Sequence, residues 1–232
     1  MPGTRALNIN EEAAVMAALD GFPLRDQAVA TVMLQLGFRI TETLSLTLGD
    51  VWAGGRIRAR VTVDRARLKG GKSCRRRSVT ARSVVINARA EAVLERFFFS
   101  RFGSSGPSPE EMDSPLFRSK KGCRLSRWQA NRVLHQVLAA AGIEASGGPR
   151  KGEYGTHSLR KTFACRVYQA SGHDLVLTRC ALGHTTVSTT EKYLPITAEA
   201  VDRAIFSLGQ DNSGRPNEGV GAREKPARIG VV

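Results

Sequence analysis

The sequence lacks any apolar run that approaches the roughly 18 residues of a membrane span. Its N-terminus, MPGTRALNINEEAAVM, has no apolar segment of the kind found in a signal peptide. The four cysteines, Cys74, Cys123, Cys165 and Cys180, are widely spaced and form no CxxC pair. This spacing disfavours a disulfide framework or a structural zinc site, and we expect reduced thiols in a cytoplasmic protein.

Acidic residues are scarce relative to basic ones. The chain has 21 Asp and Glu against 35 Lys and Arg, which leaves a net charge of +14 at pH 7. Such an excess indicates a polyanionic partner, most commonly nucleic acid. A membrane partner would need a basic amphipathic helix or a lipidation signal, and neither is found. Aromatic residues make up only 6% and no RNP-like motif occurs, which disfavours an RNA-binding module.

Apolar residues recur at helical spacing through most of the chain. The segment of residues 38–51 carries a stripe of Ile40, Leu44 and Leu48, and its polar residues Arg39, Glu42 and Thr43 are expected to point away from that stripe. The tail from residue 209 is rich in Gly and Pro and is expected to be disordered. Further helices are expected over 8–20 (capped by Asn8 or Asn10), 24–36, 90–102, 126–141, 156–172, 173–183 and 198–208.

Residues 55–89 follow a different pattern. Polar and apolar residues alternate on both sides of a turn at Gly70-Gly71, which predicts a small antiparallel β-ribbon. Residues 56–89 contain ten Arg and two Lys against a single acid, Asp64. We expect this ribbon to face phosphates. The fold class is therefore mainly α with one small antiparallel β-ribbon.

Four segments carry side chains suited to phosphate chemistry. They are GFRITETLSL with Arg39, the ribbon turn LKGGK, GTHSLRKTFA with His157 and Arg160 on one helical face, and LGHTTVSTTEKYL with His184 and Tyr193. Each segment alone is compatible with an ordinary surface or packed residue. Their order and spacing together are not expected by chance.

These segments resemble the tyrosine recombinase family, which includes phage integrases and Xer-type recombinases. The resemblance runs from about residue 10 to residue 208. It implies a site-specific recombinase or integrase that cleaves and rejoins DNA through a 3′-phosphotyrosyl intermediate, without metal, ATP or another cofactor. By this resemblance the catalytic residues are Arg39, Lys69 (with Lys72 as the alternative), His157, Arg160, His184 and Tyr193, supported by Glu42.

The chemistry of a phosphodiester agrees with these roles. Two arginines can offer paired donors to the non-bridging oxygens and stabilise the charge of the transition state. The Tyr193 hydroxyl must lose its proton as it attacks, and a neighbouring histidine, for which His157 is the candidate, can accept it. Lys69 can protonate the departing 5′-oxygen, His184 can donate a hydrogen bond to the phosphate, and Glu42 can orient the cations.

The chain departs from the family pattern at its N-terminus. Family members usually carry an additional helical domain that closes on the other side of DNA, whereas only about 20 residues precede the helix at 24–36. We expect a catalytic domain over 1–208, a tail over 209–232 and no such additional domain. A fragment, a natural single-domain enzyme and a decayed remnant would each explain this.

The partner is expected to be double-stranded DNA. The resemblance further implies self-association as a tetramer on DNA, accessory DNA-binding proteins, and a place in the prokaryotic cytoplasm on the nucleoid. A type IB topoisomerase-like enzyme and a catalytically silent DNA-binding protein are the alternatives. The DNA-binding residues expected outside the catalytic set are Lys72, Arg75, Arg76, Arg77, Lys120, Lys121, Arg124 and Arg127.

Overall fold

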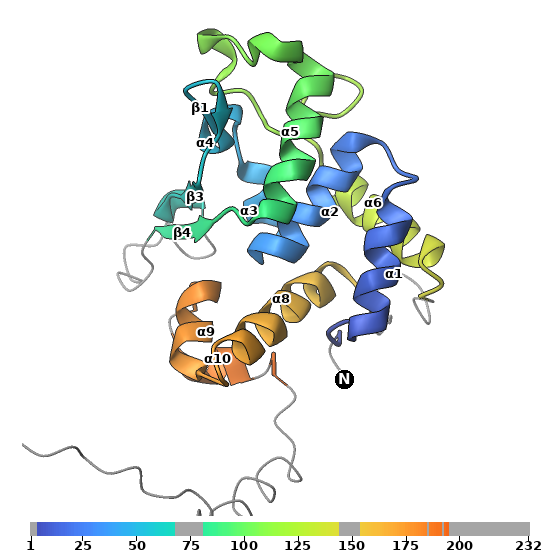
Figure 1. Cartoon of the computed structure of the whole chain (residues 1–232), viewed down its shortest axis with the longest axis vertical. Helices are drawn as coiled ribbons and strands as arrows, with labels where there is room; N and C mark the ends of the chain where they lie inside the picture. Colours follow the sequence, from blue (N-terminus) through green and yellow to red (C-terminus); the bar gives the residue numbers. More distant parts are fainter. Residues whose placement is uncertain (1–3, 68–80, 144–153, 185, 192, 195–232) are drawn as a thin grey trace, which may run out of the picture. The chain divides into compact units, whose positions relative to one another are not determined.

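The structure is a computed structural model that describes residues 4–67, 81–143, 154–184, 186–191, 193 and 194. All of them belong to one compact unit, residues 1–195 (Figure 1). Lys69, Lys72, Arg75, Arg76 and Arg77, the helix expected over 198–208 and the tail expected from residue 209 lie outside the described residues. The described α-helices are α1 (Ile9–Leu19), α2 (Leu24–Leu36), α3 (Ile40–Ser45), α4 (Leu48–Val51), α5 (Ala88–Phe102), α6 (Arg127–Ala140), α8 (Thr156–Ala170), α9 (Leu175–Leu182) and α10 (Val187–Glu191).

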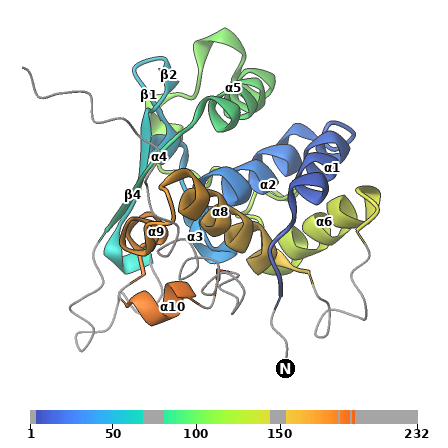
Figure 2. The same cartoon turned by 60° about the horizontal axis from the view of Figure 1, so that its bottom comes forward.

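Helix α2 is the centre of the unit. It contacts α5, α8, α3 and α6, and α8 in turn contacts α9 (Figures 1 and 2). From Asp26 to Leu36 every residue of α2 is buried, which agrees with its apolar circumference. The core around it includes Phe38, Phe98 and Phe117, all at most 1% exposed. A second small cluster, built on Ala164, Leu182 and Leu194, packs against Tyr193.

Most helix boundaries follow from local signals in the sequence. Asn8 caps α1 through a capping box with Glu11, which decides between the two cap candidates. Ser126 caps α6 in the same way with Gln129. For α8, Gly155 is the cap residue, and its backbone N–H donates to Ser158 Oγ.

The structure corrects the prediction of one continuous helix over residues 38–51. The segment forms two short helices, α3 and α4, because the chain is extended at Leu46 and Thr47. In addition, Glu42 and Thr43 are completely buried. Glu42 pairs with Arg39 of the same segment and with Arg82 and Arg160 from distant parts of the chain, and no local pattern shows the last two contacts.

The strands form two small antiparallel pairs. In the larger pair Val61 lies opposite Val84, and Val61 and Val63 point into the core. The smaller pair, a hairpin of two residues per strand, was not predicted, and neither was α10. The mainly α fold with a small antiparallel ribbon is confirmed. The strands are β1 (Trp52–Ala53), β2 (Arg56–Ile57), β3 (Arg60–Val63) and β4 (Arg82–Val85), and the 3₁₀ turns are η1 (Arg65–Arg67), η2 (Gly103–Ser105) and η3 (Pro109–Glu111).

Candidate active site

Two helix C-termini meet at the candidate site. Gly37 is the C-cap residue of α2 and Gly183 that of α9, and both glycines adopt the left-handed conformation, with φ of 61° and 64°. Neither position has room for a side chain. A Cβ on Gly37 would lie 2.2 Å from the Phe163 ring, and one on Gly183 would lie 2.9 Å from Arg82 Cδ. The last carbonyls of both helices, which have no partner within their own helix, are therefore available to nearby donors.

Arg160, on the first turns of α8, bridges these two helix ends. Its Nη1 donates to the Gly37 carbonyl, and its Nη2 donates to the Leu182 carbonyl over 2.7 Å. Its side chain is fully buried, and its Nε has no hydrogen-bond partner among the described residues. Burial, followed by the charge of Arg39, lowers the pKa of Arg160 to about 10, whereas Glu42 and Tyr193 act in the opposite direction. Arg160 thus remains charged at neutral pH.

The Glu42 carboxylate lies among three arginines. Its Oε1 is 2.6 Å from Arg39 Nη1, and its Oε2 is 3.5 Å from Arg82 Nη1 and 3.6 Å from Arg160 Nη1. Burial opposes ionisation of this carboxyl, but the charges of Arg160 and Arg39 outweigh it, and the pKa of Glu42 is lowered. One negative charge therefore faces three positive charges, and the cluster keeps an excess of positive charge for an anion.

Arg82, in β4, is the residue of this cluster that sequence reasoning did not single out. Its guanidinium is buried and donates to the carbonyls of Leu36, Gly37 and Ala181. It also stacks on the Phe38 ring, with 4.6 Å to the ring centroid. In the sequence Arg82 is one of ten arginines in the basic ribbon segment, and its charge alone does not distinguish it from the others. Its position in an otherwise alternating strand, where the pattern expects a core residue, was the available signal.

His184 follows directly after Gly183 and is 7% exposed. Its Nε2 is 3.1 Å from Arg160 Nη2, and its Nδ1 is 3.0 Å from Thr190 Oγ1. Because a guanidinium can only donate, Nε2 must accept and Nδ1 must carry the proton. Burial and the charges of Arg160 and Arg39 lower the pKa of His184 to about 3, so the ring is neutral. Both ring nitrogens are engaged, and a hydrogen bond from His184 to a phosphate would require a change in this arrangement.

Tyr193 lies against His184. The two rings meet edge to face, with 5.1 Å between their centroids. The backbone carbonyl of Tyr193 is 3.5 Å from Cys165 Sγ on α8. Lys161, the neighbour of Arg160, places its Nζ 5.8 Å from the centroid of the Tyr193 ring and also donates to the Thr4 carbonyl. The candidate nucleophile is therefore surrounded by groups from α8 and from the segment after α9.

His157 lies on the first turn of α8, on the surface. Desolvation, followed by the charges of Arg160, Arg39, Arg127 and Lys161, lowers its pKa. A histidine with a lowered pKa is neutral at pH 7 and can accept a proton. The structure thus brings Arg39, Glu42, Arg160, His184 and Tyr193 together and places His157 in the electrostatic field of the same arginines.

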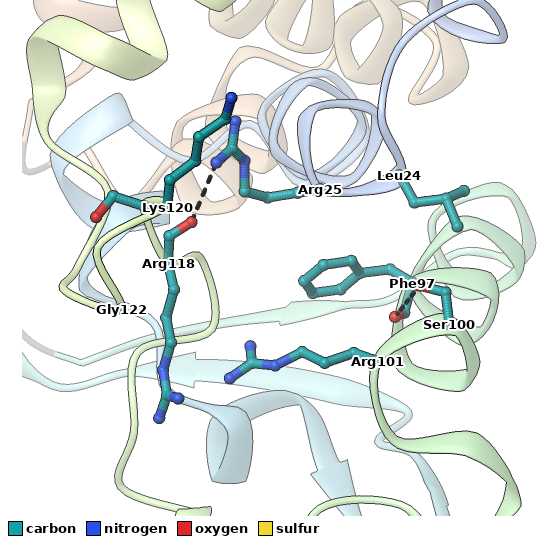
Figure 3. A pocket seen from close by; sticks show the side chains of 9 residues that line it. Leu24, Arg25, Phe97, Ser100, Arg101, Arg118, Lys120 and Gly122 are labelled. Carbon is teal, nitrogen blue, oxygen red and sulfur yellow. Dashed lines mark hydrogen bonds between the residues drawn. The ribbon is translucent and has the colours of Figure 1, made fainter.

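Four of the basic residues expected to contact DNA lie within the described residues, and all four are exposed. Arg127, at the start of α6, is exposed and close enough to the site to affect His157. Arg124 is also exposed and donates to the Leu44 carbonyl in α3. Lys120 and Lys121 are exposed, and Lys120 lines an open pocket with Arg25, Arg101 and Arg118 (Figure 3). Burial, followed by the charge of Arg118, lowers the pKa of Arg101 in this pocket.

Within the described residues, no helix is long and apolar enough to cross a membrane. In the same part of the chain, His, Cys, Asp and Glu side chains form no group of three that could hold a metal ion. Cys123, Cys165 and Cys180 are free thiols.

Relatives of known sequence place the chain in a family. The model of the Phage integrase family matches residues 5–200. Tyrosine recombinase XerC of Rhodospirillum centenum is 33% identical over 189 residues, which cover 82% of this chain and 48% of the relative. XerC of Rhizobium meliloti is 32% identical over 203 residues, covering 86% and 55%. The chain thus spans about half the length of the curated relatives it matches.

Solved structures show the same fold. XerH recombinase bound to a palindromic difH substrate, in a post-cleavage complex, matches with a TM-score of 0.63 and 23% identity over 86% of this chain and 51% of that chain. The catalytic domain of bacteriophage HP1 integrase matches with a TM-score of 0.53 and 19% identity over 87% of this chain and 95% of that chain. With the family match over residues 5–200, these findings show that the chain belongs to the phage integrase family of tyrosine recombinases.

Proposed function

We propose that this chain cleaves and rejoins DNA strands at specific sites through a covalent bond between Tyr193 and a DNA phosphate. The observation that carries the proposal is the contact of Tyr193 and His184 with a buried arginine cluster that holds one carboxylate for three cations. Such a cluster suits the extra negative charge of a phosphoryl-transfer transition state. Solved structures with the same fold include DNA complexes, among them XerH bound to a difH substrate and the Tn1549 transposon integrase with circular intermediate DNA.

In the proposed reaction the Tyr193 oxygen attacks phosphorus and the P–O5′ bond breaks. The phenolic proton passes to His157, whose lowered pKa keeps it neutral and able to accept. The departing 5′-oxygen takes a proton, for which Lys69 is the proposed donor. Because the phosphotyrosyl bond replaces one phosphodiester by another, attack by a 5′-hydroxyl reverses the step and rejoins the strand without another energy source.

The arginines have separable proposed roles. Arg39 uses one Nη for Glu42 and its side chain is 22% exposed, so it keeps donors for a non-bridging oxygen. Arg160 is more committed to backbone carbonyls, but its Nε is unpartnered within the described residues and its charge lies beside Tyr193 and His184. We assign phosphate binding to Arg39 and stabilisation of the phosphate charge to Arg160.

The partners follow from the proposed reaction. Exchange of both strands between two duplexes requires four phosphotyrosyl bonds, and we propose that four chains assemble on DNA, with accessory DNA-binding proteins as further partners. Lys120, Lys121, Arg124 and Arg127 are proposed to contact the DNA backbone, and the basic pocket beside Lys120 extends that surface. The proposed location is the bacterial cytoplasm, on the nucleoid.

The test is incubation of the full chain with a pool of suicide DNA substrates, nicked near randomised candidate sites, followed by a denaturing gel. We expect a slow-migrating protein–DNA adduct with the wild-type chain and none with Tyr193→Phe, which keeps the ring and removes the nucleophilic oxygen. An adduct that persists in Tyr193→Phe would contradict the proposal. Strand exchange between two linear duplexes, compared with relaxation of a supercoiled plasmid, then separates a recombinase from a topoisomerase-like enzyme.

A further inference from the structure

Arg82 has more contacts with the catalytic cluster than a strand residue needs for packing. The guanidinium has five N–H groups. Nε and Nη2 both donate to the Ala181 carbonyl, over 3.0 and 2.8 Å, and Nη2 also donates to the Leu36 carbonyl over 2.8 Å. Nη1 donates to the Gly37 carbonyl over 3.2 Å and lies 3.5 Å from Glu42 Oε2. These five contacts match the five N–H groups, which leaves none for a DNA phosphate.

The acceptors of Arg82 lie at the two helix ends that Arg160 also joins. Arg82 joins Leu36 and Gly37, at the end of α2, to Ala181 in the last turn of α9. Arg160 joins Gly37 to Leu182, one residue beyond Ala181. The two arginines therefore share the Gly37 carbonyl and the Glu42 carboxylate. Since the C-terminal end of a helix carries partial negative charge, both cations lie where the helix dipoles favour them.

The two helix ends lead directly into candidate catalytic residues. Gly37 is followed by Phe38, on which Arg82 stacks, and then by Arg39. Gly183 is followed by His184, and the absence of a Cβ at Gly183 is what lets the Arg82 side chain pass at this distance. A displacement of Arg82 would thus move the backbone that carries Arg39 and the backbone that carries His184.

We propose that Arg82 is a positioning residue for strand cleavage, which holds the Gly37–Arg39 and Gly183–His184 segments in register by bridging the ends of α2 and α9. This inference rests on the proposed function. A lysine at this position would keep the positive charge, but its three N–H groups spread from one point and cannot span both helix ends. The guanidinium shape, and not only its charge, is therefore required.

The test compares Arg82→Lys and Arg82→Met with the wild-type chain. Arg166→Met is the matched control, because Arg166 also cross-links helices through the side chains of Glu12 on α1 and Gln35 in the last turn of α2, whereas Arg82 binds the terminal carbonyls of α2 and α9 and the Glu42 carboxylate. Single-turnover adduct formation at saturating DNA, DNA affinity and urea unfolding are measured for each. We expect both Arg82 variants to cleave about 100-fold more slowly, because small displacements in a catalytic array have effects of this size. In both Arg82 variants the DNA affinity should stay close to the wild-type value and urea unfolding should remain cooperative. The Arg166→Met control should cleave DNA at close to the wild-type rate.

A second measurement does not depend on activity. Nitrogen-15 NMR of the histidine side chains, with His184 assigned through His184→Gln, reports which ring nitrogen carries the proton. We expect the wild-type His184 to be the Nδ1–H tautomer, and both Arg82 variants to lose this single state. Arg166→Met should retain the Nδ1–H tautomer of His184. A variant that only weakens packing elsewhere in the fold should retain it too.

Several results would overturn the inference. A wild-type cleavage rate in Arg82→Lys would show that charge suffices, and a proportional loss of DNA affinity would make Arg82 a DNA contact. Loss of cooperative unfolding in both variants would make it a general determinant of the fold. If the wild-type chain forms no adduct, the proposed function fails, and the His184 tautomer alone decides the positioning claim: an unchanged tautomer in both variants refutes it.

Discussion

The arginines inside the candidate site and two partly exposed arginines outside it are held in opposite ways. Arg82 and Arg160 have side chains that are 4% and 0% exposed, and backbone carbonyls at helix ends accept most of their hydrogen bonds. Arg5 and Arg166 are 40% and 41% exposed, and each is paired with a carboxylate of α1, Glu11 and Glu12 respectively.

The difference concerns where positive charge is left over. A carboxylate neutralises the arginine that it binds, whereas a carbonyl satisfies the N–H groups and leaves the charge in place. The outer pairs are thus close to neutral, while in the described part of the site three arginines share the single carboxylate of Glu42. Carbonyl acceptors let the fold bury cations that still attract a phosphate.

The largest expected difference between the inner and the outer arginines is in catalysis. Arg160→Gln should lower the rate of adduct formation by about 10³-fold, because it removes a preorganised cation from the transition state. Arg166→Gln, on the same helix, should leave the rate within about threefold of wild type, as expected for a surface position. Quantified denaturing gels of single-turnover reactions measure both, and equal losses in the two variants would remove the distinction between inner and outer arginines.

Loss of the shared carboxylate should be the largest effect on stability. Glu42→Gln leaves three arginines without a counter-charge, and breaking such a buried pair costs about 3 kcal/mol. Glu12→Gln breaks a half-exposed pair and should cost less than about 1 kcal/mol. Urea unfolding of the two variants gives both values. Similar costs would mean that the Glu42 cluster is solvated in solution.

The neutral state of His184 predicts a pH dependence of stability. Its pKa of about 3 in the folded chain lies below the ordinary value of 6.5, so between these values the unfolded chain binds more protons. Stability should therefore rise with pH from about 4.5 to 6.5, with a slope of at most about 1.4 kcal/mol per pH unit for one proton. The lowered pKa of Glu42 has the same sign but acts below its ordinary value of 4.5.

Thermal or urea unfolding across this range measures the slope. The control is His184→Gln, which should flatten much of it. His157 has a lowered pKa too and contributes in the same direction, so His157→Gln is measured alongside. A slope that survives in His184→Gln and disappears in His157→Gln would contradict the assignment.

A smaller effect is expected from the glycines at helix ends. Gly183→Ala and Gly142→Ala both place an alanine at positive φ, 64° and 70°, which costs about 1 to 2 kcal/mol. Only Gly183 has a neighbour in the way, Arg82 Cδ at 2.9 Å, whereas a Cβ on Gly142 meets nothing within 4 Å. We expect Gly183→Ala to be less stable than Gly142→Ala by about 1 kcal/mol, the lower end of the cost of overpacking. Equal unfolding free energies would show that the Arg82 side chain moves away from the added Cβ at no energetic cost.

The smallest effect should come from the exposed cations. Lys120→Ala and Lys121→Ala should each weaken DNA binding modestly and reduce the slope of log affinity against log salt by about 1, as for a lost phosphate contact. Binding isotherms at several salt concentrations measure this slope. Lys161 is unsuitable as a control because it lies beside Tyr193, whereas Arg166, which pairs with Glu12 on α1, is suitable. If the slope of log affinity against log salt is unchanged in both lysine variants, the segment with Lys120 and Lys121 does not contact DNA.

Most of the helices, the ribbon and the candidate site residues other than Arg82 could be predicted from the sequence. Local signals are sufficient for these features: Asn8 and Ser126 cap their helices, Gly37 and Gly183 end theirs, and the order of the Arg39, His157–Arg160 and His184–Tyr193 segments indicates the family. These signals act within a few residues of each other or as a linear order, so no tertiary contact is needed to read them.

The distribution of charge among those residues depends on the tertiary structure. The burial of Glu42, the tautomer of His184 and the involvement of Arg82 all depend on α2, β4, α8 and α9 meeting at one place. In the sequence Glu42 has the pattern of a surface residue and Arg82 is one arginine among ten. Hydrogen bonds to backbone carbonyls have no side-chain signature, because every residue has a carbonyl, and this is why the sequence could not show which arginines the helix ends would hold.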